Sequence, residues 1–306
     1  MTQQIRIRLG SRGSALALAQ ANWTAEQLRQ LGAEVEMITI RTTGDRIADR
    51  AFTPGDGKGV FTVEIERALL DGTIDLAVHS LKDLPTEMAP ELQLGAVPRR
   101  EDPRDVLVGR SAATLDTLPH GAVVGTSSLR RRAQLLARRP DLQVADMRGN
   151  VDTRLRKLDE GQYDAICLAA AGLHRLGWAA RITEYFPSDV MVSAVGQGAL
   201  ALQTRRDDLP LLALLAHLHD EPTALAIRAE RTVLAALGGG CTVPLGVLAT
   251  PQGSAMYLIA ALCSADGAHI ARETMMAHRP PEQAGILLAH RLLDRAKVMG
   301  IAVPVA

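Results

Sequence analysis

One cysteine, Cys241, stands in a setting that suits exposure of its sulfur. It follows three glycines and precedes Thr-Val-Pro in the stretch GGGCTVPLG, from Gly238 to Gly246. Glycine packs no side chain and proline ends regular elements, so the stretch predicts a loop. A loop thiolate near cationic groups has raised reactivity. Because no histidine stands nearby to activate it, the pattern indicates a sulfur presented to a ligand rather than a protease-like pair.

A strand-to-helix junction, VVGTSSLRRR, concentrates groups that bind anions. Ser127 or Ser128 can cap the helix, while Arg130, Arg131 and Arg132 fall in its first turn. Cations there oppose the helix dipole at a cost of about 0.3–1 kcal/mol each. A bound carboxylate or phosphate would remove that cost, since helix-start N–H groups, hydroxyls and guanidinium forks all hold anions. The alternative is a solvated basic helix start.

Four more arginines follow expected strands. Arg148 and Arg154 lie in MRGNVDTRLRKL, Arg175 in AAGLHRLG and Arg12 in GSRGSALAL. In a doubly wound sheet, ligands bind at the carboxyl ends of strands, so these side chains are expected to converge on one crevice. The guanidinium fork suits carboxylates, and several forks together predict a polyanionic ligand.

One acidic residue belongs to the same set of loops. Asp83 follows Lys82 just beyond the strand in IDLAVHSLKDLP. A carboxylate beside arginines stays ionised at neutral pH, where it can stabilise a developing cation or assist proton transfer. The alternative is an ordinary turn aspartate. His79, within the strand pattern, is expected to be a packed, hydrogen-bonded histidine.

A glycine-rich segment, GDGKGVF, carries Lys58 and Phe61. It lacks the G-x-x-x-x-G-K-[ST] order of a phosphate-binding loop. We therefore interpret it as a mobile flap.

The elements that must position these residues alternate between β and α patterns. Expected strands cover residues 5–11, 34–40, 74–80, 122–126, 142–147 and 164–170, and expected helices 14–31, 62–72, 127–139 and 151–161. This alternation predicts an α/β fold with two doubly wound domains and mainly parallel sheets.

Two charged or glycine-rich crossings, residues 98–105 and 193–208, divide the chain as in bilobal binding proteins. A helix from residue 223, two apolar segments and a last helix from residue 281 predict a small α+β domain at the C-terminal end. We expect three domains: residues 1–99 with 198–218, carrying the flap and Asp83; residues 104–194, carrying the arginines; and residues 221–306, carrying Cys241.

Composition excludes several function classes. The 306 residues include 34 basic and 34 acidic side chains, so no net charge draws the chain to nucleic acid or an anionic membrane. Few aromatic residues are available to stack on bases, and the longest apolar run is too short to span a bilayer. The default expectation is a cytoplasmic protein. Its three cysteines, with Cys167 and Cys263 buried in strands, are expected to be reduced, with no disulfide and no metal site.

Seven stretches, in this order and spacing, resemble hydroxymethylbilane synthase, the porphobilinogen deaminase family. They cover nearly the whole chain. They are GSRGSALALAQ, DLAVHSLKDLP, GTSSLRRRAQ, RGNVDTRL, AAGLHRLG, AVGQGAL and GGGCTVPLG.

The resemblance implies an activity and a cofactor. Cys241 would hold a dipyrromethane cofactor, made from the substrate, through a thioether bond. Four porphobilinogen molecules would be added to it head to tail with release of ammonia, and water would free the linear tetrapyrrole hydroxymethylbilane for haem, chlorophyll and corrin synthesis. The fold implied is two domains resembling bilobal periplasmic binding proteins plus a third that carries the cysteine.

The resemblance also assigns residues. Asp83 would be catalytic, and acetate and propionate groups on every pyrrole ring would explain the arginines. The implied cofactor-binding residues are Cys241, Asp83, Lys82, Ser128, Arg130, Arg131 and Arg148. The implied substrate-binding residues are Arg12, Ser14, Arg148, Arg154, Arg175 and Gln197, while Lys58 and Phe61 belong to the flap.

Two positions depart from the family's pattern. Gly13 replaces a larger polar residue, and Gly239 stands where an acidic residue often occurs. We expect a monomer that contacts uroporphyrinogen III synthase at most transiently. The competing hypothesis is a non-catalytic bilobal anion-binding protein, which explains the arginines but not Asp83 together with Cys241.

Overall fold

The chain forms two compact units in a computed structural model that describes residues 5–46, 61–238, 243–264, 267–278 and 280–302. Unit 1 comprises residues 1–101 and 199–224, and unit 2 comprises residues 102–198 and 225–306. The chain therefore passes from one unit to the other after Glu101, Gly198 and Ala224. The division into three domains stays a prediction.

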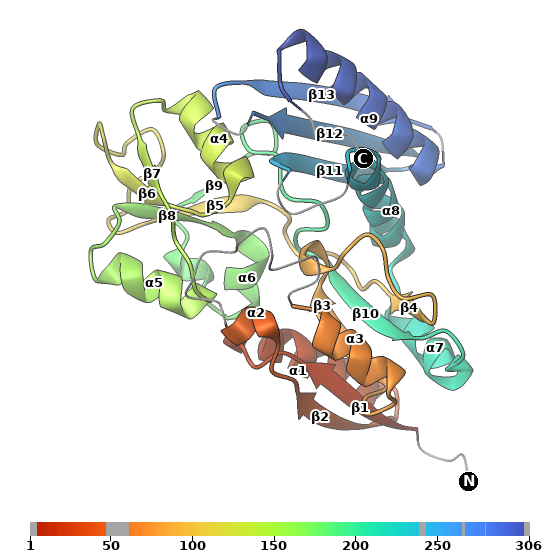
Figure 1. The fold of residues 1–306 in the computed structure, drawn as a ribbon. Coiled ribbons are helices and arrows are strands. Elements are labelled where there is room, and N and C mark those ends of the chain that lie inside the picture. Colours follow the sequence, from red (N-terminus) through yellow and green to blue (C-terminus); the bar gives the residue numbers. More distant parts are fainter. Residues whose placement is uncertain (1–4, 47–60, 239–242, 265–266, 279, 303–306) are drawn as a thin grey trace. The chain divides into compact units, whose positions relative to one another are not determined.

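Unit 1 contains a five-stranded sheet of order β2-β1-β3-β10-β4 (Figure 1). Its strands are β1 (Arg6–Ser11), β2 (Glu34–Thr39), β3 (Leu76–Ser80), β4 (Leu92–Ala96) and β10 (Leu200–Arg205). Its helices are α1 (Ala15–Gln30), α2 (Thr43–Arg46), α3 (Val63–Leu70), α7 (Leu209–Leu215) and the 3-10 turns η1 (Leu81–Asp83) and η3 (Ala216–Leu218). Strand β1 is parallel to both β2 and β3, so the carboxyl ends of β1 and β3 lie at one edge of the sheet.

Both faces of this sheet are buried under helices. Leu76 and Val78 of β3 belong to one apolar cluster with Leu28 of α1, whereas Ala77 belongs to another with Leu69 of α3. Successive side chains of a strand point to opposite faces, so this alternation places one core on each side. A doubly wound arrangement follows.

Unit 2 contains a second five-stranded sheet, of order β7-β6-β8-β5-β9. Its strands are β5 (Asp105–Gly109), β6 (Val123–Gly125), β7 (Gln143–Ala145), β8 (Ala165–Ala169) and β9 (Glu184–Tyr185). Its helices are α4 (Leu129–Arg138), α5 (Val151–Asp159), α6 (Ala170–Arg175) and the 3-10 turn η2 (Ala179–Arg181). The faces again alternate, since Cys167 packs in a cluster with Leu135 of α4 and Leu168 in a cluster with Leu155 of α5.

One strand in each sheet departs from the expected parallel order. Strand β10 is antiparallel to β3 and β4, and β5 is antiparallel to β8 and β9. Both strands begin just after the chain enters a unit, at Ala199 and Asp102, without a helical crossover to return the chain to a parallel start. As a result, Asp105 pairs with Ala169, at the edge where the parallel strands end.

The remainder of unit 2 is a three-stranded antiparallel sheet, β11-β12-β13, with two helices beside it (Figure 1). The elements are β11 (Leu245–Gln252), β12 (Ala255–Cys263), β13 (Ile270–Ala277), α9 (Pro281–Val298) and α8 (Glu221–Ala236), of which residues 221–224 belong to unit 1. Leu258 of β12, Val233 of α8 and Leu288 of α9 share one buried cluster. These elements confirm the predicted fold class: two doubly wound α/β sheets and a small α+β part.

Candidate active site

Asp83 and Lys82 stand on a short turn that presents them at the carboxyl end of β3. The turn η1 begins with Leu81, which is 1% exposed and whose N–H donates to the carbonyl of Ala199 at 3.0 Å. Leu84 is also buried, and its N–H donates back to the carbonyl of Leu81 at 3.1 Å. With two buried leucines as anchors, the two charged residues between them are exposed.

The residue before the turn has a partner that the sequence analysis missed. Gln20, buried in α1, donates from Nε2 to the Oγ of Ser80 at 2.8 Å. The bond ties the end of β3 to α1. A glutamine in a helix of mostly small apolar residues was the available signal.

Arg12 lies at the same edge, because it follows β1, the parallel neighbour of β3. Its Nε donates to Oδ1 of Asp45 at 3.0 Å, and its guanidinium carbon lies 4.1 Å from the centre of the Phe61 ring. Partial burial acts to raise the pKa of Asp45, but the hydrogen bond and charge of Arg12 hold it below its ordinary value. Ser14 accepts from the N–H of Ala17 at 3.3 Å and so caps α1. Arg12 therefore already binds a carboxylate.

The basic start of α4 is buried rather than solvated. Ser128 is the N-cap, accepting from the N–H of Arg131 at 3.4 Å. Arg130 and Arg131 are only 5% and 6% exposed, whereas Arg132 is exposed. The two buried guanidiniums share Asp105: Arg130 Nη1 donates to its Oδ2 at 2.6 Å and Arg131 Nε to its Oδ1 at 2.8 Å.

Asp105 is the main functional candidate that the sequence analysis missed. It is 0% exposed and also accepts from Nε2 of Gln197 at 3.0 Å. Burial by itself would raise the pKa of Asp105, but the charges of Arg130 and Arg131 outweigh it and keep the pKa well below the ordinary range. The carboxylate is therefore ionised. In the sequence, Asp105 ends the charged run PRREDPRD, which predicts a crossing between two domains and gives no sign that this aspartate is buried.

The other arginines of unit 2 lie at the same edge of its sheet. Arg148 follows β7 and is half-buried, and Arg154 donates from Nε to the carbonyl of Gly149 at 2.7 Å. Arg175, at the end of α6 after β8, donates from Nη2 to the carbonyl of Gly198 at 2.8 Å. Since β6 is parallel to β7 and β8, these residues follow strands that end at one edge of the sheet. Their convergence on a crevice shared with Arg12 stays a prediction.

The two buried thiols, Cys167 and Cys263, lie close enough to arginines of unit 2 for the arginine charges to act on their pKa values. Burial raises the pKa of Cys167 to about 12, although the charges of Arg131, Arg130 and Arg154 all act on it in the opposite direction. Burial likewise raises the pKa of Cys263 to about 11. Both thiols are therefore protonated and unreactive at neutral pH, as expected for cysteines inside strands.

Three residues of the sequence analysis lie outside the described residues: Cys241, Lys58 and Gly239. The structure does describe both ends of the stretch GGGCTVPLG, at Gly238 and Gly246. Gly238, just after the end of α8, has a positive φ of 82°, which glycine adopts without strain. At the other end, a Cβ on Gly246 would lie 2.5 Å from the carbonyl oxygen of Val192, the oxygen that accepts a bond from Arg130 at 2.7 Å.

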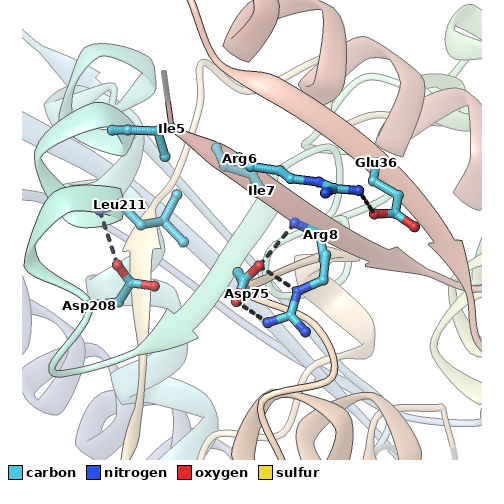
Figure 2. A pocket seen from close by; sticks show the side chains of 8 residues that line it. All are labelled: Ile5, Arg6, Ile7, Arg8, Glu36, Asp75, Asp208 and Leu211. Atoms are coloured by element: carbon cyan, nitrogen blue, oxygen red, sulfur yellow. Dashed lines mark hydrogen bonds and ion pairs between the residues drawn. The ribbon is translucent and has the colours of Figure 1, made fainter. Parts of the chain in front are cut away.

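A hollow of about 470 Å³ lies elsewhere, at the start of β1 (Figure 2). Both of its arginines pair with carboxylates of the lining: Arg8 Nη2 donates to Asp75 at 2.7 Å, and Arg6 Nη2 to Glu36 at 3.0 Å. Arg12 stands at the opposite end of the same strand. Because both arginines are already paired and the lining has more carboxylates than cations, this hollow is not the candidate site for a polyanion.

Comparison with known proteins agrees with this geometry. Residues 7–213 match the family model "Porphobilinogen deaminase, dipyromethane cofactor binding domain", and residues 224–294 match "Porphobilinogen deaminase, C-terminal domain". The chain belongs to the porphobilinogen deaminase family. The resemblance noted in the sequence is thereby confirmed.

Relatives match over most of their length. Porphobilinogen deaminase of Syntrophotalea carbinolica is 49% identical, over 94% of this chain and 93% of the relative. That of Shouchella clausii is 53% identical over 88% of each. Among solved structures, a periplasmic substrate-binding protein of an ABC transporter from Coxiella burnetii has a TM-score of 0.44 at 15% identity, covering 74% of this chain and 96% of that one.

Membership of the porphobilinogen deaminase family confirms the expected activity. The chain is a transferase that polymerises porphobilinogen into hydroxymethylbilane with a dipyrromethane cofactor, and nothing favours the non-catalytic alternative. Within the part of the chain that the structure describes, no helix combines the length and apolar character needed to cross a membrane.

Proposed function

We propose that this chain builds hydroxymethylbilane on a cofactor attached to Cys241, with arginines of unit 2 holding the carboxylates and Asp83 serving the chemistry. The observation that carries the proposal is the group of arginines at the ends of β6, β7 and β8. A pyrrole bearing acetate and propionate groups needs several guanidiniums, which bind carboxylates bidentately.

The residues present fit the cofactor. Arg130 and Arg131 bring two buried positive charges against the single negative charge of Asp105. Arg148, Arg154 and Arg175 add further cations at the same edge. We assign cofactor carboxylates to Ser128, Arg130, Arg131 and Arg148 together with Lys82, and substrate carboxylates to Arg12, Ser14, Arg148, Arg154, Arg175 and Gln197.

Attachment through Cys241 is supported by elimination. The two other thiols, Cys167 and Cys263, are buried in strands, and burial raises the pKa of each. Neither can act as a thiolate. When bound, the cofactor supplies a pyrrole ring whose free carbon accepts the next unit.

Asp83 is the residue we assign to the chemical steps. Loss of ammonia from the aminomethyl group of porphobilinogen leaves positive charge on the substrate, and an adjacent carboxylate stabilises such charge. The attacking pyrrole must then lose a proton, which the same carboxylate can accept. Exposure on a turn held by Leu81 and Leu84 is consistent with both roles.

We further propose that the protein works as a cytoplasmic monomer, with at most transient contact with uroporphyrinogen III synthase. The family resemblance supports this, and the three-domain division with a flap at Lys58 and Phe61 rests on the same basis.

Intact-mass measurement tests the proposal. We expect the purified protein to exceed its sequence mass by two linked pyrrole units and Cys241→Ser to lose both the addition and the activity. Cys263→Ser is the matched control and should keep both. An unmodified mass for active protein, or an adduct mapped to Cys167 or Cys263, would contradict the proposed attachment.

A further inference from the structure

The start of α4 buries two positive charges against one negative charge. Arg130 and Arg131 are 5% and 6% exposed, and the carboxylate of Asp105, between them, is 0% exposed. Among the residues that the structure describes, no second carboxylate forms an ion pair with either guanidinium. The cluster therefore carries one excess positive charge, and buried charge without a partner is strongly unfavourable.

Asp105 fixes how the two guanidiniums are oriented. Arg130 donates to this carboxylate from two nitrogens, from Nη1 to Oδ2 at 2.6 Å and from Nη2 to Oδ1 at 3.2 Å. Arg131 approaches Oδ1 from the other side, with Nε at 2.8 Å. Two carbonyls complete the arrangement: Val192 accepts from Arg130 Nη1 at 2.7 Å and Cys167 from Arg131 Nη1 at 2.9 Å.

These contacts leave donors for a ligand. An arginine has five N–H donors. Three of those on Arg130 are engaged by Asp105 and Val192, and Arg131 likewise meets Asp105 through Nε and Nη2 and Cys167 through Nη1. Two donors remain on each side chain. One carboxylate would match both the excess charge and these donors.

We propose that Asp105 is a positioning residue for the reaction: it orients Arg130 and Arg131 and reduces their combined charge so that the pair binds one carboxylate of the pyrrole chain. This inference rests on the proposed function and adds to it a residue that touches no substrate itself. The sheet explains its location, since β5 runs antiparallel to β8 and so begins at the edge where β6, β7 and β8 end.

Asp105→Asn tests the role, because it keeps the shape of the side chain and removes its charge. We expect the fraction of molecules that carry the pyrrole adduct to fall, and kcat/KM for porphobilinogen to drop about tenfold or more in the folded fraction. Asp141→Asn is the matched control: Asp141 pairs with Arg139, at the other end of α4, with Nε at 2.7 Å from Oδ1. It should retain wild-type adduct and kcat/KM.

A second readout separates positioning from a merely structural role. The Tm of Cys241 protein minus the Tm of its Cys241→Ser counterpart measures how much the bound cofactor stabilises the fold. We expect this difference to shrink in Asp105→Asn and in Arg131→Leu, because each disturbs the same carboxylate contact. A structural role would lower both Tm values and leave their difference unchanged.

The double variant Asp105→Asn/Arg131→Leu covers the case in which Asp105→Asn does not fold. It has the same excess charge as the wild-type cluster, so it should fold but bind the cofactor poorly. Wild-type adduct and kcat/KM in a folded Asp105→Asn variant would overturn this inference alone. The same result in the double variant would overturn it and also remove Arg131 from the proposed cofactor contacts. A wild-type protein without any adduct would instead overturn the proposed function, and this inference with it.

Discussion

His79 Nε2 lies 3.0 Å from Oε1 of Gln203, across the antiparallel pair β3 and β10. The amide nitrogen of Gln203 donates to Oε1 of Glu66 at 2.8 Å, so its oxygen is the acceptor and His79 Nε2 carries the hydrogen. Burial, helped by the charge of Arg12 and opposed by the hydrogen bond to Gln203, lowers the pKa of His79 to about 4. His79 is therefore a neutral, packed histidine in the strand that leads to Asp83, as its place in the sequence predicted.

This histidine should make stability depend on pH. Its folded pKa lies below its unfolded value of 6.5, so the unfolded chain binds a proton first as pH falls. The contribution of neutral His79 to the free energy of unfolding is fully present above pH 6.5. It is lost progressively as pH falls toward 4, by up to about 3 kcal/mol. We expect His79→Gln to flatten the Tm profile in this window. His290→Gln, at an exposed position, should not. Parallel profiles for wild type and His79→Gln would contradict the assignment.

Gly246→Ala should destabilise unit 2. The added Cβ would lie 2.5 Å from the carbonyl oxygen of Val192, which is backbone and cannot rotate away. Overpacking of this kind costs about 1–3 kcal/mol. The same carbonyl accepts from Arg130, so adduct formation should decline as well. Thermal unfolding and intact mass measure the two effects.

Gly13→Ala provides the comparison for Gly246→Ala. Its nearest new contact would be the methyl group of Thr39 at 3.3 Å, which can move slightly. A Gly246→Ala protein as stable as Gly13→Ala would show that the close approach is not constraining.

The sequence predicted the local elements well because their signals are local. The first helix, expected over residues 14–31, is α1 with Ser14 as its N-cap, and the local β pattern located strands such as β3 and β8. Strands β5 and β10 were not predicted. Each pairs with strands distant in the chain, and a short apolar run next to charged residues does not reveal that pairing.

The same limit explains what was missed in the site. The arginines of VVGTSSLRRR were correctly placed at a helix start, but no local pattern identified Asp105 as the carboxylate that pairs with Arg130 and Arg131. Asp105 follows a proline and an arginine in a run that looks solvated, and only the antiparallel pairing of β5 with β8 buries it. Contacts between residues 25 or more positions apart require the tertiary fold.

Arg148→Leu should weaken binding with little loss of stability. Its side chain is half-buried at the edge where β7 ends, so leucine removes a cation without emptying the core. We expect kcat/KM for porphobilinogen to fall about tenfold, with Tm within a few degrees of wild type. Arg110→Leu is the control, because Arg110 follows β5 and so lies at the opposite edge. Equal kinetics for the two variants would contradict the role of Arg148.

Asp83→Asn separates chemistry from binding at the residue to which we assign the chemical steps. Asparagine keeps the size and some hydrogen bonding of aspartate but removes the charge that we propose stabilises the cation left by ammonia loss. Turnover should therefore fall about 10²–10³-fold, while KM for porphobilinogen changes little because the arginines remain. Since Asp83 is exposed on η1, Tm should stay at the wild-type value.

The control for Asp83→Asn is Asp71→Asn, an exposed aspartate at the end of α3 in the same unit. It loses the same charge at a comparable surface position and should keep wild-type turnover. Each variant is loaded with cofactor and assayed for porphobilinogen consumption and for thermal unfolding. The two assays give turnover and Tm for each protein. An ordinary turn aspartate predicts the reverse pattern for Asp83→Asn, with lower Tm and unchanged turnover per folded molecule, and that result would remove Asp83 from the catalytic machinery.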